Sequence, residues 1–258
     1  MKKITADIIK QDHLVDDIYS MWIKCPSIAN EAHSGQFVSL YTKNAARMLP
    51  RPISICELDK KAGSLRLVYR TAGKGTTEFS TYKKGDTIEV LGPIGNGYSL
   101  DAHRPILMGG GIGIPPMLQL AKELSAKGVS KDNMTVILGF RDNTFLVNEF
   151  KKLATILISS DTGSVGVKGT VIDAARESGV EGDMIYACGP KPMLRAIKSY
   201  AYEKDIDAEI SLEERMACGI GACLACVCKT TEKDEHSQVN NKRVCVDGPV
   251  FKIDDVEL

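Results

Sequence analysis

The sequence predicts a multi-domain protein of the β plus α/β class, and three observations along the chain support this prediction. The first hundred residues contain short segments rich in β-branched and aromatic residues, separated by turn signals. From Asp101 onward, strand-like segments alternate with segments of helical periodicity. The end of the chain is rich in cysteine and follows neither pattern. We therefore expect two larger units and a small C-terminal one.

The first unit is predicted to be all-β. Its strand-like segments are Ile18–Lys24, Gln36–Tyr41, Pro52–Glu57, Ser64–Tyr69 and Thr87–Leu91. Turn signals at residues 61–63 and 84–86 separate neighbouring segments, and no helical period lies between them. Several short strands in this arrangement indicate an antiparallel barrel or a sandwich.

The second unit is predicted to contain a parallel sheet. A short apolar strand, Pro105–Met108, runs into a glycine-rich turn and then into a helix over Pro115–Lys127, with proline at its start and Gly128 just past its end. Further strands are expected at Thr135–Phe140, Thr155–Ser159 and Met184–Ala187, and helices at Phe145–Leu153, Thr170–Glu177 and Lys191–Tyr202. Strands that alternate with helices of this length indicate a parallel sheet covered on both faces.

Length and charge exclude several classes of protein. The 258 residues contain 33 Lys and Arg against 33 Asp and Glu, so the formal net charge is zero. A nucleic-acid binder gains most of its affinity from a positive surface, so this balance argues against one. No signal peptide and no apolar run of about 20 residues is visible, so we expect no membrane partner and a cytoplasmic location. In that compartment cysteines stay reduced or bind metal.

The cysteines near the end of the chain form the most specific motif. Cys218-x4-Cys223-x2-Cys226, followed by Cys245, has the spacing that holds a plant-type [2Fe–2S] cluster. Three of the four thiolates must come from one tight loop, and the glycines and alanines between them allow the close approach that this requires. These four cysteines are the predicted metal ligands.

Other interpretations of the cysteines are weaker. A structural zinc site would use two pairs of closely spaced ligands, and the second pair is missing here. The Cys223–Cys226 pair lacks the following histidine of a haem attachment site, and a thioredoxin-like role would not explain the neighbouring thiols. Cys228 is a surplus cysteine that could replace Cys226, although the spacing favours Cys226.

Two strand-to-helix junctions in the second unit indicate a nucleotide site. The run Gly109–Pro116 lies where backbone N–H groups can meet a pyrophosphate, but Pro116 departs from the G-x-G-x-x-G pattern. By itself this run fits a cofactor turn or tight packing equally well. The segment Tyr186–Pro190 again ends a strand and opens a helix, at the edge where open parallel sheets bind ligands. Cys188 in this segment could equally be a small residue that fills a crowded strand end.

Together these motifs resemble a known family. The strand Arg51–Ser54, the glycine run and the segment 186–190 resemble the ferredoxin–NADP reductase superfamily. With the cysteine loop, and above all Met216–Cys223, the whole chain resembles the electron-transfer subunits of class 1B dihydroorotate dehydrogenases. The resemblance implies an FAD-binding β-barrel domain over residues 1–101, an NAD-binding Rossmann-like domain over 102–210 and a [2Fe–2S] domain over 211–258.

The resemblance also implies cofactor contacts. Arg51 would neutralise the FAD pyrophosphate and Ser54 would hydrogen-bond near the flavin, although without the resemblance Arg51 and Arg70 would be interpreted as solvated surface charges. The other implied FAD residues are Pro52, Ile53, Val68, Tyr69, Arg70, Gly75 and Thr76. The implied NAD residues are Gly110, Gly111, Gly113, Cys188 and Gly189.

The implied function is electron transfer in pyrimidine biosynthesis. Electrons would pass from the FMN of a catalytic subunit, which forms orotate, through [2Fe–2S] and FAD to NAD⁺, in a heterotetramer with two copies of each chain. No acid–base or nucleophilic constellation is visible, so we expect no catalytic side chain, and Glu213–Glu214 is interpreted as a solvated helix end. Alternatives are the small subunit of a hydrogenase, sulfite reductase, transhydrogenase or NAD(P)H–ferredoxin oxidoreductase, and a non-catalytic iron–sulfur or zinc module.

Overall fold

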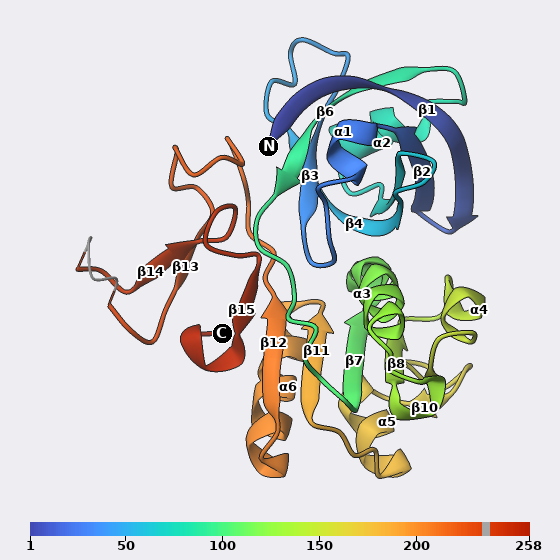
Figure 1. Cartoon of the computed structure of the whole chain (residues 1–258), viewed down its shortest axis with the longest axis vertical. Helices are drawn as coiled ribbons and strands as arrows, with labels where there is room; N and C mark the ends of the chain where they lie inside the picture. The colour runs from blue at the N-terminus through green and yellow to red at the C-terminus, as the bar shows by residue number, and fades with distance from the viewer. Residues whose placement is uncertain (234–237) are drawn as a thin grey trace.

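The computed structural model describes residues 1–233 and 238–258, and its first unit is a closed antiparallel barrel with strand order β1-β2-β5-β4-β3-β6 (Figure 1). This confirms the barrel over the sandwich. The strands are β1 (Lys2–Val15), β2 (Ile18–Lys24), β3 (Phe37–Tyr41), β4 (Arg51–Asp59), β5 (Ser64–Arg70) and β6 (Thr87–Ile94). Two short helices, α1 (Pro26–Ala29) and α2 (Lys74–Ser80), accompany them.

Strand β1 closes the barrel and was not predicted from the sequence. Its first half pairs with β6, from Lys2 opposite Gly92 to Asp7 opposite Thr87, and its second half pairs with β2. Only alternate residues such as Ala6 and Ile8 are buried, while charged side chains occupy the outer face. The strand contains no continuous apolar run, because its side chains alternate between the core and solvent and the solvent-facing ones are charged.

The second unit is a seven-stranded sheet with order β10-β9-β8-β7-β11-β12-β15. Its strands are β7 (Pro105–Gly110), β8 (Thr135–Phe140), β9 (Thr155–Ser160), β10 (Val167–Lys168), β11 (Met184–Cys188), β12 (Asp207–Ser211) and β15 (Val250–Lys252). The strands from β10 to β12 run parallel, and β15 pairs with β12 in the antiparallel direction. The predicted parallel sheet is thus confirmed.

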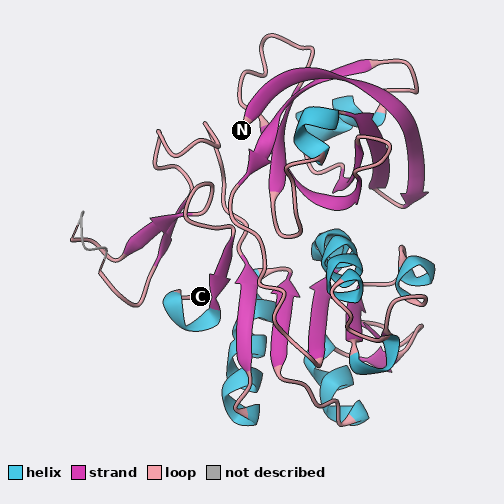
Figure 2. Ribbon diagram, in the orientation of Figure 1, coloured by secondary structure: helices cyan, strands magenta, loops and turns pink. Residues whose placement is uncertain are grey.

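Helices cover both faces of this sheet (Figures 1 and 2). The core on one face includes residues of α5 (Val171–Ser178) and α6 (Lys191–Lys204), and the core on the other includes α3 (Ile114–Ala126) and α4 (Val147–Phe150). Short 3₁₀ turns lie at η1 (Gly111–Gly113), η2 (Lys131–Asn133) and η3 (Ile253–Asp255). Helix α4 begins later than predicted, because Leu146 before it adopts a left-handed backbone with φ of 61°, and it ends at Phe150, before the predicted Leu153.

The C-terminal segment adds a two-stranded antiparallel ribbon of β13 (Val227–Lys229) and β14 (Asn241–Arg243). It then returns to the parallel sheet through β15, so that the cysteine-containing loops are attached to the edge of that sheet. In Figure 1 this segment lies beside both the barrel and the end of β12. No helix among the described residues is long and apolar enough to cross a membrane.

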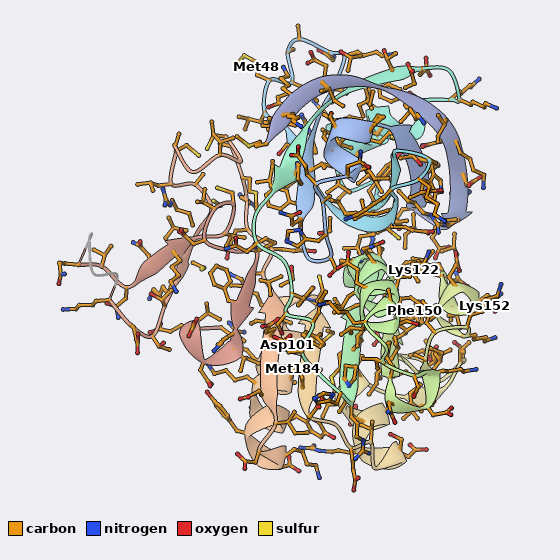
Figure 3. All side chains as sticks on the ribbon, in the orientation of Figure 1. Met48, Asp101, Lys122, Phe150, Lys152 and Met184 are labelled. Atoms are coloured by element: carbon orange, nitrogen blue, oxygen red, sulfur yellow. The ribbon has the colours of Figure 1, made fainter. Side chains whose placement is uncertain are left out.

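The barrel meets the second unit along α3. The Leu58 N–H donates to Gln119 Oε1 at 2.8 Å, and the Ser34 hydroxyl donates to Glu123 Oε2 at 2.7 Å. Figure 3 shows Lys122 on the same helix directly beneath the barrel, where it pairs with Glu57. These polar contacts fix the position of the strand ends of one unit relative to the other.

Candidate functional site

A mostly apolar cavity of about 350 Å³ lies where the three parts of the chain meet. The barrel contributes residues of β4 and β5 and Thr76 of α2 to it, and the opposite wall comes from η1 and the segment after β12. Of the residues that the resemblance implied for FAD, the structure brings Pro52, Ile53, Ser54, Val68, Tyr69, Arg70 and Thr76 to this cavity. The remaining two, Arg51 and Gly75, lie just beside it.

The cavity opens into the barrel because β4 and β5 separate there. The two strands pair from Ile55 opposite Leu67 to Asp59 opposite Ser64, and the pairing stops before Ser54 and Val68. Beyond that point β4 pairs only with β3, and β5 pairs only with β2. Each strand therefore presents one free backbone edge to the cavity, and Pro52, which has no N–H, is tolerated at such an edge. This gives a planar ligand ring both an apolar slot and backbone hydrogen-bonding groups.

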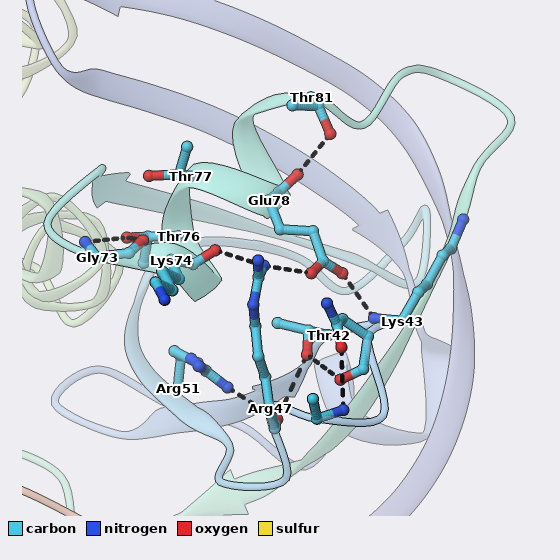
Figure 4. A network of polar contacts seen from close by, with 12 residues as sticks. Thr42, Lys43, Arg47, Arg51, Gly73, Lys74, Thr76, Thr77, Glu78 and Thr81 are labelled. Carbon is cyan, nitrogen blue, oxygen red and sulfur yellow. Dashed lines mark hydrogen bonds and ion pairs between the residues drawn. The ribbon is translucent and has the colours of Figure 1, made fainter.

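Arg51 and Gly75 are in direct contact. A Cβ atom on Gly75 would lie 2.0 Å from Arg51 Nε, so only glycine leaves room for the guanidinium at this point. Thr76 Oγ1 accepts hydrogen bonds from Ala72 N at 3.0 Å and Gly73 N at 3.2 Å, which fixes the turn into α2 (Figure 4). The structure thus places next to the cavity an arginine whose Nε and Nη2 form no hydrogen bond with the described residues, in the chemistry that suits a pyrophosphate.

A second and more polar cavity of about 690 Å³ lies at the carboxyl ends of β7, β8 and β9. Gly110 and Gly111 line it, whereas Gly113 and Cys188 pack against each other: a Cβ atom on Gly113 would lie 2.2 Å from the Cys188 carbonyl oxygen. Burial raises the pKa of the Cys188 thiol, which is 1% exposed. Cys188 therefore stays a neutral thiol in a crowded contact between η1 and β11.

Ser159 in this second cavity was not expected from the sequence, and Arg70 was expected only among the FAD contacts. Ser159 Oγ at the end of β9 is buried, lines the cavity and has no hydrogen-bond partner in the described part of the chain. A buried hydroxyl without a protein partner leaves a hydrogen-bonding position for a ligand or an ordered water. Arg70 lines both cavities and lies 3.4 Å, from Nε to Oδ2, from Asp17. It therefore lies where the two ligands would meet.

The segment after β12 corrects one interpretation from the sequence. Residues 212–216 form no helix, and Glu213, which remains exposed, and Glu214, which is half-buried, line the first cavity. Although the open cavity leaves Glu213 exposed, the protein around it partly desolvates its carboxyl and raises its pKa, an effect that the charge of Arg70 opposes. Glu214 pairs with Lys191 of α6. The signal that could have located Glu213 is its position directly after a parallel strand, at the ligand-binding edge.

The cysteine loop, Cys218–Cys226, begins directly after this segment. Gly219 and Gly221 have φ of 68° and 84°, a left-handed backbone that glycine adopts without strain. Ile220 N donates to Cys218 Sγ at 3.4 Å, and although burial opposes ionisation, N–H donors of this loop lower the pKa of Cys218 to about 6. A loop that stabilises a thiolate in this way fits the demands of an iron–sulfur ligand.

The other predicted ligands lie around the same loop. Cys223 is exposed, whereas Cys226 and Cys245 are buried and Val244 N donates to Cys226 O at 3.0 Å. Among the described residues, no three cysteines lie close enough together to hold a metal ion. The fit to a cluster therefore rests on the four thiol donors and on the loop conformation. Cys228 points elsewhere, because its Sγ donates to Lys242 O at 3.4 Å within the β13–β14 ribbon.

The first cavity and the cysteine loop are adjacent along the chain. Met216 lines the cavity, and Cys218 follows two residues later. Two residues of extended chain span at most about 7 Å. A ligand in the cavity and a metal group on Cys218 are therefore held close together by covalent connection alone.

Comparisons with known proteins agree with this arrangement. Residues 213–257 match the iron–sulfur cluster binding domain of dihydroorotate dehydrogenase B, and residues 107–199 match an oxidoreductase NAD-binding domain. Proteins named "Dihydroorotate dehydrogenase B (NAD(+)), electron transfer subunit" from Geobacillus sp. (strain WCH70) and Listeria monocytogenes serotype 4a (strain HCC23) are each 42% identical to this chain, with 100% of both sequences covered.

Solved structures give the same fold. A structure of NADH-dependent reduced ferredoxin–NADP oxidoreductase superposes with a TM-score of 0.87 at 30% identity, covering 98% of this chain and 89% of the other. Phthalate dioxygenase reductase superposes with a TM-score of 0.66 at 18% identity, covering 95% and 94%. At that identity the second likeness concerns the fold alone.

Proposed function

Because the chain belongs to the family of electron-transfer subunits of dihydroorotate dehydrogenase B, we propose that it links a partner subunit to NAD through a [2Fe–2S] cluster and FAD. It is an NAD-linked oxidoreductase subunit with these three cofactors. The observation that carries the proposal is the adjacency of the apolar cavity and the cysteine loop through Met216 and Cys218. An electron carrier needs its cofactors close together and sealed from water.

The first cavity is proposed to hold the FAD ring system. The free edges of β4 at Pro52–Ser54 and of β5 at Val68–Arg70 would hydrogen-bond its polar edge, and the apolar walls would exclude water. Arg51, with Gly75 and Thr76 beside it, would bind the pyrophosphate. When bound, FAD supplies the chemistry that couples hydride exchange with NAD to single-electron exchange with the cluster.

The second cavity is proposed to hold NAD. Gly110 and Gly111 would let the backbone approach the pyrophosphate, and Ser159 would donate or accept a hydrogen bond. Gly113, Cys188 and Gly189 would keep η1 packed closely against β11. Arg70, which lines both cavities, would orient the nicotinamide end toward the flavin.

The cluster is proposed to be held by Cys218, Cys223, Cys226 and Cys245. Around it Ile220 and Leu224 are 47% and 63% exposed, so two large apolar side chains of the same loop are available for contact with a partner. We propose that a catalytic subunit, which carries FMN and oxidises dihydroorotate to orotate, covers this loop, in a heterotetramer with two copies of each chain. The functional units would be residues 1–101 for FAD, 102–210 for NAD and 211–258 for the cluster.

The experiment is anaerobic purification followed by a visible spectrum and assays for iron and FAD. We expect FAD and about two irons per chain. In Cys218→Ser, NADH should still bleach the flavin, while electron transfer to a co-expressed catalytic subunit should be lost. Absence of FAD or iron from the wild-type protein contradicts the proposal, and retained transfer in Cys218→Ser shows that the cluster lies off the electron path.

A second candidate function is supported by the likeness to the structure of NADH-dependent reduced ferredoxin–NADP oxidoreductase, with a TM-score of 0.87. The same chain architecture would then serve a partner that handles ferredoxin in place of dihydroorotate. Purification of the natural complex separates the two functions, since its activity with dihydroorotate or with reduced ferredoxin identifies the partner.

A further inference from the structure

One arginine connects helix α2 to the loop at residues 42–50, which joins β3 to β4 (Figure 4). Arg47 Nη1 donates to Glu78 Oε2 at 2.7 Å and to the Lys74 carbonyl oxygen at 2.8 Å. The side chains of Arg47 and Glu78 are only 28% and 15% exposed. The pair is therefore more shielded than an ordinary surface ion pair, whose contribution is small.

Glu78 is the centre of this arrangement. Its other carboxylate oxygen accepts hydrogen bonds from Lys43 N at 2.7 Å and from the Tyr82 hydroxyl at 2.6 Å. Burial would raise the pKa of Glu78, but the Tyr82 and Lys43 donors and the charge of Arg47 lower it below its ordinary value. The carboxylate is therefore ionised at neutral pH and holds the loop at two points, Lys43 and Arg47.

The loop at residues 42–50 in turn holds the side chain of Arg51. Arg51 Nη1 donates to the carbonyl oxygens of Arg47, at 3.2 Å, and of Leu49. On its other side the guanidinium rests against Gly75, where a Cβ atom would lie 2.0 Å from Nε. A guanidinium has five N–H donors, so one nitrogen can be fixed by the loop while the others remain available to an anion.

We propose that the Arg47–Glu78 pair is a latch that positions Arg51 for the pyrophosphate of the bound dinucleotide and slows release of that dinucleotide. This inference rests on the FAD site proposed above. Arg47 and Glu78 act through Arg51, so they are positioning residues. Holding a charged side chain in its binding orientation before the ligand arrives reduces the entropy lost on binding.

The test measures the release of FAD from the purified full-length protein, followed by the rise in fluorescence of the freed flavin after strong dilution. We expect Arg47→Ala and Glu78→Gln each to release FAD about tenfold faster, which corresponds to about 1.4 kcal/mol. Arg47→Lys retains the charge but cannot donate in the same forked geometry, so its release rate should be intermediate. The control is Arg176→Ala, which removes the exposed ion pair between Arg176 of α5 and Glu203 of α6; Arg176 lines neither cavity.

Two further measurements make the outcomes distinguishable. If the latch acts through Arg51, the double variant Arg47→Ala/Arg51→Ala should release FAD no faster than Arg51→Ala alone. Faster release in the double variant overturns the proposal. A lowered melting temperature of the apoprotein with an unchanged release rate also overturns it, because the pair would then be merely structural.

Arg51→Ala separates this inference from the proposed function. If Arg51→Ala weakens FAD binding while Arg47→Ala leaves it unchanged, the FAD site stands and the latch is wrong. If Arg51→Ala binds FAD as the wild type does, both the assignment of Arg51 and the latch are wrong.

Discussion

Arg66 on β5 of the barrel forms an ion pair with Glu149 on α4 of the parallel-sheet unit, with 3.2 Å between Nη1 and Oε1. Arg66 is 8% exposed, and its other contacts lie within the barrel: Nε donates to Ser20 Oγ at 2.8 Å, and Glu57 lies 3.4 Å from Nη1. One buried guanidinium thus joins the two units on which the flavin and nicotinamide sites are proposed to lie.

We expect Arg66→Met to lower the free energy of unfolding by about 2 kcal/mol, because it leaves the buried Ser20 hydroxyl and the half-buried Glu57 carboxylate without this donor. Guanidinium chloride unfolding of the FAD-loaded protein measures this change. Arg104→Met is the matched control, since Arg104 and Glu181 are 56% and 79% exposed and their pair should contribute little. Equal effects of the two variants would show that Arg66 does not join the units energetically.

Arg70→Met should separate flavin binding from flavin reduction. Arg70 lines both cavities, and the FAD contacts proposed for β5 come from its free backbone edge. We expect the FAD content to remain near that of the wild type, while kcat/KM for flavin reduction by NADH falls about tenfold, as for the loss of one charge-assisted hydrogen bond. Anaerobic stopped-flow reduction measures the rate, and Arg195→Met on the exposed side of α6 is the control. Loss of FAD with an unchanged reduction rate would assign Arg70 to the flavin site alone.

Cys226 and Cys228 can be told apart by substitution. Cys228 Sγ donates to Lys242 O inside the β13–β14 ribbon, whereas Cys226 lies next to Cys245. Cys226→Ser should therefore lose most of the cluster, while Cys228→Ser should keep it. Iron content and the visible absorption of the cluster provide the measurement. The opposite result would make Cys228 the ligand that the spacing disfavoured.

Helix α5 should give a measurable pH effect on stability. Asp173 Oδ2 accepts hydrogen bonds from Thr170 N and Oγ1, both at 2.7 Å, and the Thr170 N–H lowers the pKa of Asp173 from its ordinary value of 3.8. Because the ionised form is favoured in the folded state, this stabilisation is present above pH 3.8 and is lost as the pH falls through the lower folded value.

Asp173→Asn should therefore cost about 1 kcal/mol at pH 7, as for the loss of a helix cap, and should make the acid loss of stability shallower. Unfolding curves measured from pH 7 down to about pH 3 test both effects. Glu177→Gln on the same helix is exposed and serves as the control. A parallel pH profile for wild type and Asp173→Asn would contradict the role of the carboxylate.

The sequence by itself determined the features that depend on local spacing. The interval between Cys218, Cys223 and Cys226 is set by the reach of one loop around a metal group, and proline and glycine bound α3 because they act on their own backbone. Periods of two and 3.6 residues likewise indicated most strands and helices, and with them the parallel sheet. These signals need no knowledge of distant contacts.

The tertiary structure decided what depends on pairing between distant segments. The separation of β4 from β5 at Ser54 and Val68, which opens the first cavity, follows from register and leaves no trace in composition. The position of Arg70 between two cavities, and of Glu213 in one of them, arises because the barrel, the sheet edge and the C-terminal segment meet in space. Long-range strand pairing and domain contact set these positions, and neither is encoded in the spacing of neighbouring residues.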